Sequence, residues 1–204
     1  MTPEELLSIL GRAEKLKENT RHCWITPDRK ESVADHTWRM TLMAMLLDGE
    51  PEFQDVDLDK VRRMCLIHDL GEAFTGDIPA FEKSDADGDR ELAIFMNWVN
   101  TFPSPQREEW RALLMEMEEL KTPEARVYKA LDKLEAVISH DESDIRSWLP
   151  NEYELQLTYG AENMKVSPYF GRLRKVVDAW TRRKIAEASE EKKATDEAAS
   201  EASH

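Results

Sequence analysis

The chain has 204 residues, of which 41% are hydrophobic and 34% charged, and its formal net charge is −14. This length and balance indicate a soluble globular protein with one domain and a sizeable core. The negative charge argues against a nucleic-acid polymer as partner, because neutralising a phosphate backbone requires clustered Lys and Arg side chains. A small phosphorylated ligand stays open, because one well-placed arginine can dominate a local pocket.

Cysteine content and the length of apolar runs indicate the cellular compartment of the protein. The two cysteines, Cys23 and Cys65, form neither a CxxC pattern nor a similar zinc motif. The longest apolar run, around residues 42–47, is far shorter than the roughly 18 residues of a membrane span. No signal peptide opens the sequence. We therefore expect a protein of a reducing compartment, the cytoplasm, without membrane contact.

Helix signals dominate the sequence, and strand signals are nearly absent. Ser/Thr-Pro pairs at residues 2–3, 104–105, 122–123 and 167–168 are typical of helix starts, where the hydroxyl caps and the proline takes the first helical position. Apolar spacing and these caps predict helices over residues 3–18, 32–48, 57–71, 87–101, 105–120, 123–140, 151–160 and 168–187. Polar loops are expected over residues 19–31 and 72–86.

The last twenty residues differ in composition from the rest of the chain. They lack aromatic residues and hold almost no large apolar side chains. Such a composition favours a frayed or disordered tail with no catalytic role. We therefore place the folded domain at residues 1–184 and a charged tail at residues 185–204.

The pair His68-Asp69 is the most informative feature, because it interrupts a mostly apolar run from Met64 to Leu70. An imidazole and a carboxylate are costly to bury without a partner, and a divalent metal satisfies both. His36 and Asp132, each on its own predicted helix, supply two further ligands. This mixed N/O set favours a first-row metal over Ca²⁺. Such a metal acidifies a bound water and polarises a phosphoryl oxygen, so we predict a hydrolytic site.

Each proposed ligand also has an ordinary alternative. A single helical histidine such as His36 is more often a hydrogen-bonded residue than a ligand. Asp132, which is followed by Lys133, is typical of a solvated helix position when taken alone. His140, eight residues after Asp132, is a rival ligand. We rank His140 lower because acidic, loop-like sequence follows it at a predicted helix end.

Glu72 follows His68 by four residues and Asp69 by three, so the three side chains would project toward one side of a helical turn. A carboxylate in that position can orient or deprotonate an attacking water. The alternative is an ordinary acid at a helix end, just after Gly71.

Together these residues resemble the signature of a known family. The order His36…His68-Asp69…Asp132 is similar to the H…HD…D pattern of the HD-domain metal-dependent phosphohydrolases. The segments ESVADH (31–36), CLIHDLGEAFTGDIP (65–79) and ALDKLE (130–135) narrow the resemblance to the small 5′-deoxynucleotidases, over residues 5–180 or so. The resemblance implies an all-α, single compact helical HD domain with about seven to nine helices, and a homodimer. It also implies hydrolysis of deoxyribonucleoside 5′-monophosphates to deoxynucleosides and phosphate.

The resemblance further implies roles for individual residues. Glu72 would assist the attacking water, and Asp77 would contact the sugar and position the substrate. Arg21 would hold the phosphate, and Trp24 would shape the sugar or base pocket. One divalent metal per chain, with Mn, Co, Fe, Ni and Zn as candidates and Mg as a further one, would be held by His36, His68, Asp69 and Asp132.

Three alternatives stay open. In some relatives the aromatic residue directly follows the arginine, whereas two residues separate Arg21 from Trp24 here, which leaves the discrimination between deoxyribose and ribose undetermined. HD-domain proteins also hydrolyse nucleoside triphosphates, cyclic nucleotides and guanosine polyphosphates, although the short chain favours a monophosphatase. A metal-stabilised interaction protein without turnover is the third reading. Glu72, Asp77 and Arg21 near the ligand set weigh against it.

Overall fold

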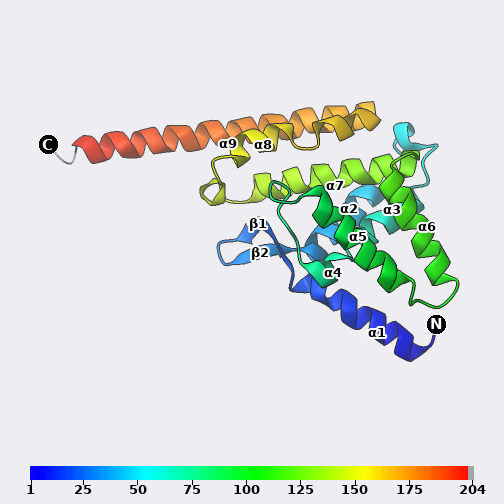
Figure 1. Ribbon diagram of the computed structural model, residues 1–204. Coiled ribbons are helices and arrows are strands. Elements are labelled where there is room, and N and C mark those ends of the chain that lie inside the picture. The colour runs from blue at the N-terminus through cyan, green and yellow to red at the C-terminus, as the bar shows by residue number, and fades with distance from the viewer. Residues whose placement is uncertain (202–204) are drawn as a thin grey trace.

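The computed structural model describes the backbone of residues 1–201 and the side chains of residues 1–195 and 197. Helices make up almost all of its regular structure, so the prediction of an all-α fold with seven to nine helices is confirmed (Figure 1). Within residues 1–201, no helix combines the length and apolar character needed to cross a membrane. The α-helices are α1 (Pro3–Ala13), α2 (Val33–Leu46), α3 (Leu58–Ile67), α4 (Glu72–Thr75), α5 (Asp85–Val99), α6 (Gln106–Glu119), α7 (Pro123–Glu142), α8 (Glu152–Thr158) and α9 (Pro168–Glu201).

Three of the four predicted helix starts are confirmed by capping contacts. The hydroxyls of Thr2, Thr122 and Ser167 each accept a hydrogen bond from the backbone N–H three residues later, at 3.1–3.2 Å. These bonds satisfy N–H groups that have no partner inside the helix. Ser104 was expected to cap in the same way, but this prediction is wrong. Helix α6 begins one residue later than expected, after Pro105, and lacks a side-chain cap.

The polar loop expected over residues 19–31 is instead an antiparallel hairpin of β1 (Thr20–Thr26) and β2 (Arg29–Ser32). The register shifts between the pairs Thr20–Ser32 and Trp24–Lys30, and again beyond Trp24. The strands carry many polar residues and pair irregularly, so they lack the apolar alternation that marks a half-buried strand. The sequence therefore concealed the hairpin.

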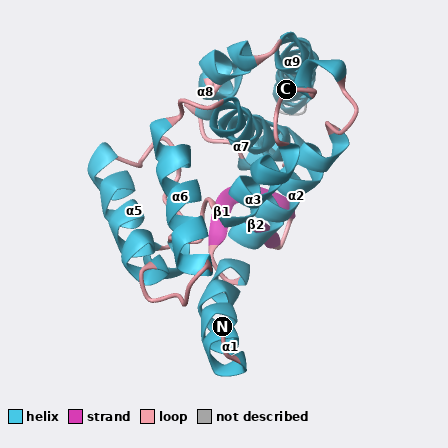
Figure 2. Cartoon of the chain, turned by 90° about the vertical axis from the view of Figure 1, so that its right-hand side faces the viewer, coloured by secondary structure: helices cyan, strands magenta, loops and turns pink. Residues whose placement is uncertain are grey.

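Helix α7 lies at the centre of the fold and carries the longest run of buried side chains. It contacts α2, α3, α6 and α9. Figure 2 shows α5 and α6 as a pair set to one side of this core, with α1 extending from the body. Leu131, Leu134 and Val137 of α7 are each at most 1% exposed. Burial of each such side chain contributes roughly 1.5–3 kcal/mol, which fixes the helix that carries Asp132.

Helix α9 is longer than predicted. The sequence suggested an end near residue 187 and a frayed tail, but the helix continues to Glu201. Its distal half is rich in Ala, Glu and Lys, which have high helix propensity, and its side chains between residues 189 and 195 are exposed. Propensity rather than core packing supports this half. Residues 202–204 of the predicted tail lie outside the described residues, and the domain boundary at 184/185 stays a prediction.

Candidate active site

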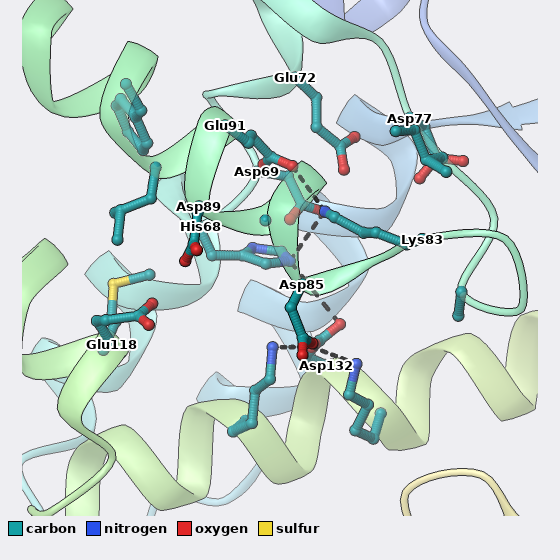
Figure 3. A pocket seen from close by; sticks show the side chains of 18 of the residues that line it. His68, Asp69, Glu72, Asp77, Lys83, Asp85, Asp89, Glu91, Glu118 and Asp132 are labelled. Carbon is teal, nitrogen blue, oxygen red and sulfur yellow. Dashed lines mark hydrogen bonds and ion pairs between the residues drawn. The ribbon is translucent and has the colours of Figure 1, made fainter.

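The four predicted metal ligands come from three segments that meet beside α7. His36 Nε2 lies 3.8 Å from Asp69 Oδ2 and 3.6 Å from Asp132 Oδ1, and His68 Nε2 lies 3.0 Å and 3.9 Å from the same two oxygens. Figure 3 shows the His68 ring between the two carboxylates. Metal–donor bonds are about 2.0–2.2 Å long, so separations of this size suit donors that share one ion.

The sequence predicted that His68 and Asp69 lie within a helix, but this prediction is wrong. Helix α3 ends at Ile67, and a turn carries both residues before α4 begins at Glu72. The backbone N–H of Glu72 donates to the Asp69 carbonyl at 3.0 Å, which keeps Glu72 next to the ligand pair. The prediction that the three side chains share one helical turn is therefore wrong, although their proximity is retained.

Second partners fix the orientation of both imidazoles. His36 Nδ1 donates to Glu135, and His68 Nδ1 donates to the Cys65 carbonyl at 3.0 Å. Each ring then turns Nε2 toward the carboxylates. Among the described residues, both Nε2 atoms are buried without a hydrogen-bond partner. Orphaned buried nitrogens that face two carboxylates fit a divalent metal, because the metal satisfies all four groups.

Glu135 supports this arrangement from the next turn of α7. Its side chain is completely buried and also accepts from Arg39 Nε at 2.6 Å and from Arg21 Nη1 at 3.2 Å. Burial opposes the charged form, but His36, Arg21 and Arg39 lower the pKa of Glu135 to about 2. A charged Glu135 therefore holds the His36 ring. The sequence placed Glu135 beside Asp132 but gave it no role.

Asp132 is not the solvated helix residue that its neighbour Lys133 suggested. The residue is 8% exposed, and its Oδ2 lies 2.9 Å from Lys129 Nζ and 3.4 Å from Lys133 Nζ. Burial opposes ionisation, but the two lysines and His36 hold the pKa of Asp132 well below its usual range. The carboxylate thus turns one oxygen to the lysines and the other to the histidines.

Glu72 is buried at the start of α4, and its Oε2 has no hydrogen-bond partner in the described part of the chain. The side-chain amide of Asn19 anchors the Glu72 carbonyl. Oxygens of Asp69, Glu72 and Glu91 lie within 4.8 Å of one another. Gly71 permits this approach of α5, because a Cβ there would be 2.9 Å from Glu91 Cγ. Burial and the negative charge of Asp69 raise the pKa of Glu72 to about 11.

A cavity of about 690 Å³ opens over the ligand cluster, within the 300–1,000 Å³ typical of small-molecule sites. His68, Asp69, Glu72 and Asp132 lie in its wall (Figure 3). A side pocket of about 90 Å³ adjoins it and shares with it Arg21, Asp77, Ala80 and Tyr159.

Arg21 and Asp77 both line the main cavity. Asp77 follows Gly76, whose φ of +78° favours glycine, and burial raises the pKa of the Asp77 carboxyl. Arg21 donates from Nη1 to Glu31 at 3.1 Å and to Glu135 at 3.2 Å. The guanidinium therefore has two carboxylate partners that the sequence did not reveal.

Trp24 departs from its predicted place. It is not among the described side chains that line either cavity. Its backbone N–H donates to Ser143 Oγ at 3.2 Å, and Lys30 Nζ lies 5.3 Å from its ring centroid. His22 lines the side pocket instead, with Phe81 against its ring at 5.5 Å. The irregular pairing of β1 accounts for the difference, because strict alternation no longer decides which side chains face the site.

The rival ligand His140 does not join the cluster. Its ring stacks on Trp148 with centroids 4.4 Å apart, and its Nδ1 lies 3.6 Å from Cys23 Sγ. The residue lies two turns further along α7 than Asp132 and contributes to the wall of the side pocket. The geometry therefore favours the four ligands that we ranked first.

Comparison with known proteins identifies the fold family. The chain is 32% identical over 162 residues to 5′-deoxynucleotidase HDDC2 of Dictyostelium discoideum, which covers 74% of this chain and 83% of that protein. It is 30% identical to the protein of the same name in Homo sapiens, with 67% of each chain covered. A solved structure from Magnetospirillum magnetotacticum MS-1, described as a predicted metal-dependent phosphohydrolase, superposes with a TM-score of 0.76 at 27% identity, covering 89% of this chain and 93% of that one. The HD-domain family model matches residues 13–174, and the chain belongs to the HD-domain family.

Proposed function

We propose that this protein is a 5′-deoxynucleotidase, which hydrolyses deoxyribonucleoside 5′-monophosphates to deoxynucleosides and phosphate. The observation that carries the proposal is the convergence of His36, His68, Asp69 and Asp132 on one point in the wall of a cavity sized for a nucleotide. The name 5′-deoxynucleotidase belongs to relatives that match most of the chain. A small-molecule nucleotide, rather than a polymer, suits an acidic protein.

Family and site together indicate a divalent metal as cofactor. Two imidazoles and two carboxylates would hold it, and we propose Mn, Co, Fe, Ni or Zn, with Mg as a further candidate. When bound, a divalent cation lowers the pKa of water and neutralises charge on a phosphoryl oxygen. Glu135 keeps the His36 Nδ1 proton in place, so that Nε2 remains available as a donor atom.

Glu72 is proposed as the residue that manages the proton of the attacking water. Its Oε2 is buried at the cavity wall and unpaired by any described side chain. The acidic neighbours favour the protonated form, whereas the charge of a divalent cation beside Asp69 favours the carboxylate. The carboxylate accepts a proton at Oε2 as the water oxygen attacks phosphorus. The departing 5′-oxygen leaves on the opposite side of phosphorus and takes its proton from solvent water.

Arg21 and Asp77 are proposed to position the nucleotide. Both line the main cavity and the side pocket, so a substrate that extends from one into the other contacts them. Asp77 suits a sugar hydroxyl, because a carboxylate accepts its hydrogen bond. Arg21 adds positive charge near the phosphate, although Glu31 and Glu135 share it. The role of Trp24 in shaping the sugar or base pocket stays a prediction, although Trp24 is not among the described residues that line the two cavities.

The decisive experiment measures phosphate release from deoxyribo- and ribonucleoside mono- and triphosphates, cyclic nucleotides and guanosine polyphosphates. Metal-stripped protein is assayed with Mn²⁺, Co²⁺, Fe²⁺, Ni²⁺, Zn²⁺ or Mg²⁺ added back. Metal-dependent release from deoxynucleoside monophosphates, fastest among the substrates, supports the proposal. Faster release from another nucleotide class would show that this class, and not the deoxynucleoside monophosphates, is the substrate. Silence across the panel, despite bound metal, favours the interaction-protein reading.

The homodimer is also a proposal. Trp38, Leu42 and Met45 recur on one face of α2 and are 63%, 37% and 53% exposed. Apolar side chains gathered on one helix face are typical of protein–protein contacts. Light scattering should give twice the chain mass for the wild type and the monomer mass for Trp38→Glu. A monomeric wild type would exclude the homodimer without affecting the proposed chemistry.

A further inference from the structure

The cavity over the ligand cluster is strongly acidic, which constrains where a phosphate can bind. Its wall includes Asp69, Glu72, Asp77, Asp85, Asp89, Glu91, Glu118 and Asp132, and Figure 3 shows most of these carboxylates around one space. An anionic substrate is repelled there unless cations oppose these charges. The cationic side chains in the wall are Arg21, Lys83, Lys129 and Lys133.

Three of these four cations are engaged elsewhere. Arg21 Nη1 is shared by Glu31 and Glu135, and Lys83 Nζ lies 2.6 Å from Glu91 Oε2. Lys133 Nζ donates to the Tyr159 hydroxyl at 2.7 Å and lies 4.8 Å from the centroid of the same ring. The Gly160 backbone packs so closely on Lys133 that a Cβ there would lie 2.4 Å from Lys133 Cβ. Lys133 is thus fixed in place by the loop after α8.

Lys129 differs from the other three. Within the described residues its ammonium forms one ion pair, with Asp132 Oδ2 at 2.9 Å, and it lies 5.6 Å from the Tyr128 ring centroid. An ammonium has three N–H donors, so two remain when one donates to Asp132. The Lys129 side chain is 28% exposed and lies in the cavity wall, where those donors can meet a ligand.

The position of Lys129 relative to Asp132 places it beside the reacting group without blocking the metal. Asp132 presents Oδ2 to Lys129 and Oδ1 to the two histidines. Only the Asp132 carboxylate group therefore separates the Lys129 ammonium from a phosphate held at the histidine side. The neighbours Ala130 and Leu131 are at most 1% exposed, so the backbone that carries Lys129 is anchored in the core.

We propose that Lys129 is a phosphate-binding residue of the active site, donating from its ammonium to a non-bridging oxygen of the substrate phosphoryl group. Lys133, tied to Tyr159, is a positioning residue that holds the other side of Asp132. The assignment rests on the proposed function in that the ligand is a phosphate monoester. A charge-assisted hydrogen bond contributes about 1.5–3 kcal/mol, equivalent to roughly a 10- to 150-fold change in affinity.

The test measures the affinity of inorganic phosphate for manganese-loaded protein by calorimetry, together with manganese content by atomic emission. Lys129→Met should weaken phosphate binding about 10- to 150-fold while retaining the wild-type manganese content. Lys129→Arg, which keeps the charge, should recover part of the loss. Lys121→Met is the matched control, because Lys121 is 76% exposed and pairs with Glu119 outside the cavity; it should bind phosphate as the wild type does.

Unchanged phosphate affinity in Lys129→Met would overturn the proposal, and so would a loss of affinity that accompanies loss of manganese. If Lys129→Met does not fold, Lys129→Gln is judged by the same two measurements. Because phosphate binding needs no turnover, the result is separable from the proposed function. A wild type that hydrolyses no deoxynucleotide, yet loses phosphate affinity in Lys129→Met, would overturn the substrate but retain the phosphate site.

Discussion

Helix α7 carries two groups of buried polar residues that the sequence presents as similar. Asp132 and Glu135 lie in its middle, and His140 and Asp141 lie near its C-terminal end. All four are less than 10% exposed, so each needs compensation for burial. The middle group meets His36 and His68, whose Nε2 atoms point at carboxylates from two different segments.

In the part of the chain that the structure describes, the terminal group is compensated in part by other side chains and involves only one carboxylate from another segment. Thr181 donates to Asp141 Oδ2 at 2.7 Å, and the Trp148 indole donates to the His140 carbonyl at 3.2 Å and stacks on the ring. The His140 Nε2 has no hydrogen-bond partner among the described residues and faces a single carboxylate, that of Glu152 at 3.6 Å, which His22 Nε2 also approaches at 3.0 Å. Buried polar residues therefore do not by themselves mark a metal centre. Two unpaired imidazole nitrogens that meet two carboxylates from separate segments do.

The largest effect is expected for the metal ligands. His68→Ala removes a nitrogen that faces Asp69 and Asp132, so the variant should lose stoichiometric metal, and phosphate release should fall to background. Atomic emission and the phosphate assay on the same sample measure both. His140→Ala is the matched control from the terminal group and should retain the metal. Equal metal loss in both variants would remove the distinction between the two groups.

The next effect separates metal binding from proton transfer. Glu72→Gln should keep the metal, because Glu72 is outside the four-ligand set, but should lose about 10²- to 10⁴-fold in kcat. Its Oε2 is the unpaired oxygen at the cavity wall, and an amide there accepts no proton. Metal content and kcat are measured on the same preparation. Undiminished kcat would exclude Glu72 from the reaction.

Much of this site could be predicted because the ligands carry a local signal. The His68-Asp69 pair interrupts an apolar run, and the helix that carries Asp132 shows clear apolar spacing at Leu131 and Leu134. The supporting contacts carried no such signal. Glu135 pairs with His36 and Arg39 across nearly one hundred residues of sequence, and only the folded chain shows that these side chains meet.

The hairpin and the end of α9 were missed for physical reasons of their own. β1 is polar and irregularly paired, so period-two alternation did not indicate it, and the contacts of Trp24 with Ser143 and Lys30 could not be foreseen. The distal half of α9 holds almost no large apolar side chains, a composition that is typical of disorder. Helix propensity alone extends it to Glu201. Lys129 was overlooked because a lysine on a helix is ordinarily solvated.

A smaller effect tests the support of the metal centre. Glu135→Gln keeps the shape of the side chain but removes the charge that holds His36 and that Arg21 and Arg39 neutralise. Loss of such a partner costs about 10- to 100-fold in metal affinity or activity. Titration of metal into stripped protein measures the change. Metal affinity equal to that of the wild type would show that His36 is held well enough by its surroundings in the core.

The smallest effect concerns stability at the terminal group. Burial lowers the pKa of His140 to about 4 from its ordinary 6.5, with Glu152 opposing and His22 adding to the shift. Between these values the unfolded chain binds a proton that the folded chain does not, so the free energy of unfolding falls as pH drops from 6.5 toward 4. The contribution is fully present above pH 6.5.

His140→Phe keeps an aromatic ring against Trp148 but cannot titrate. On moving from pH 7 to pH 5 in urea denaturation, the wild type should lose about 2 kcal/mol more than this variant. Parallel losses in the two proteins would show that His140 titrates alike in the folded and unfolded chains, and that the terminal group is less well sealed from water than its contacts indicate.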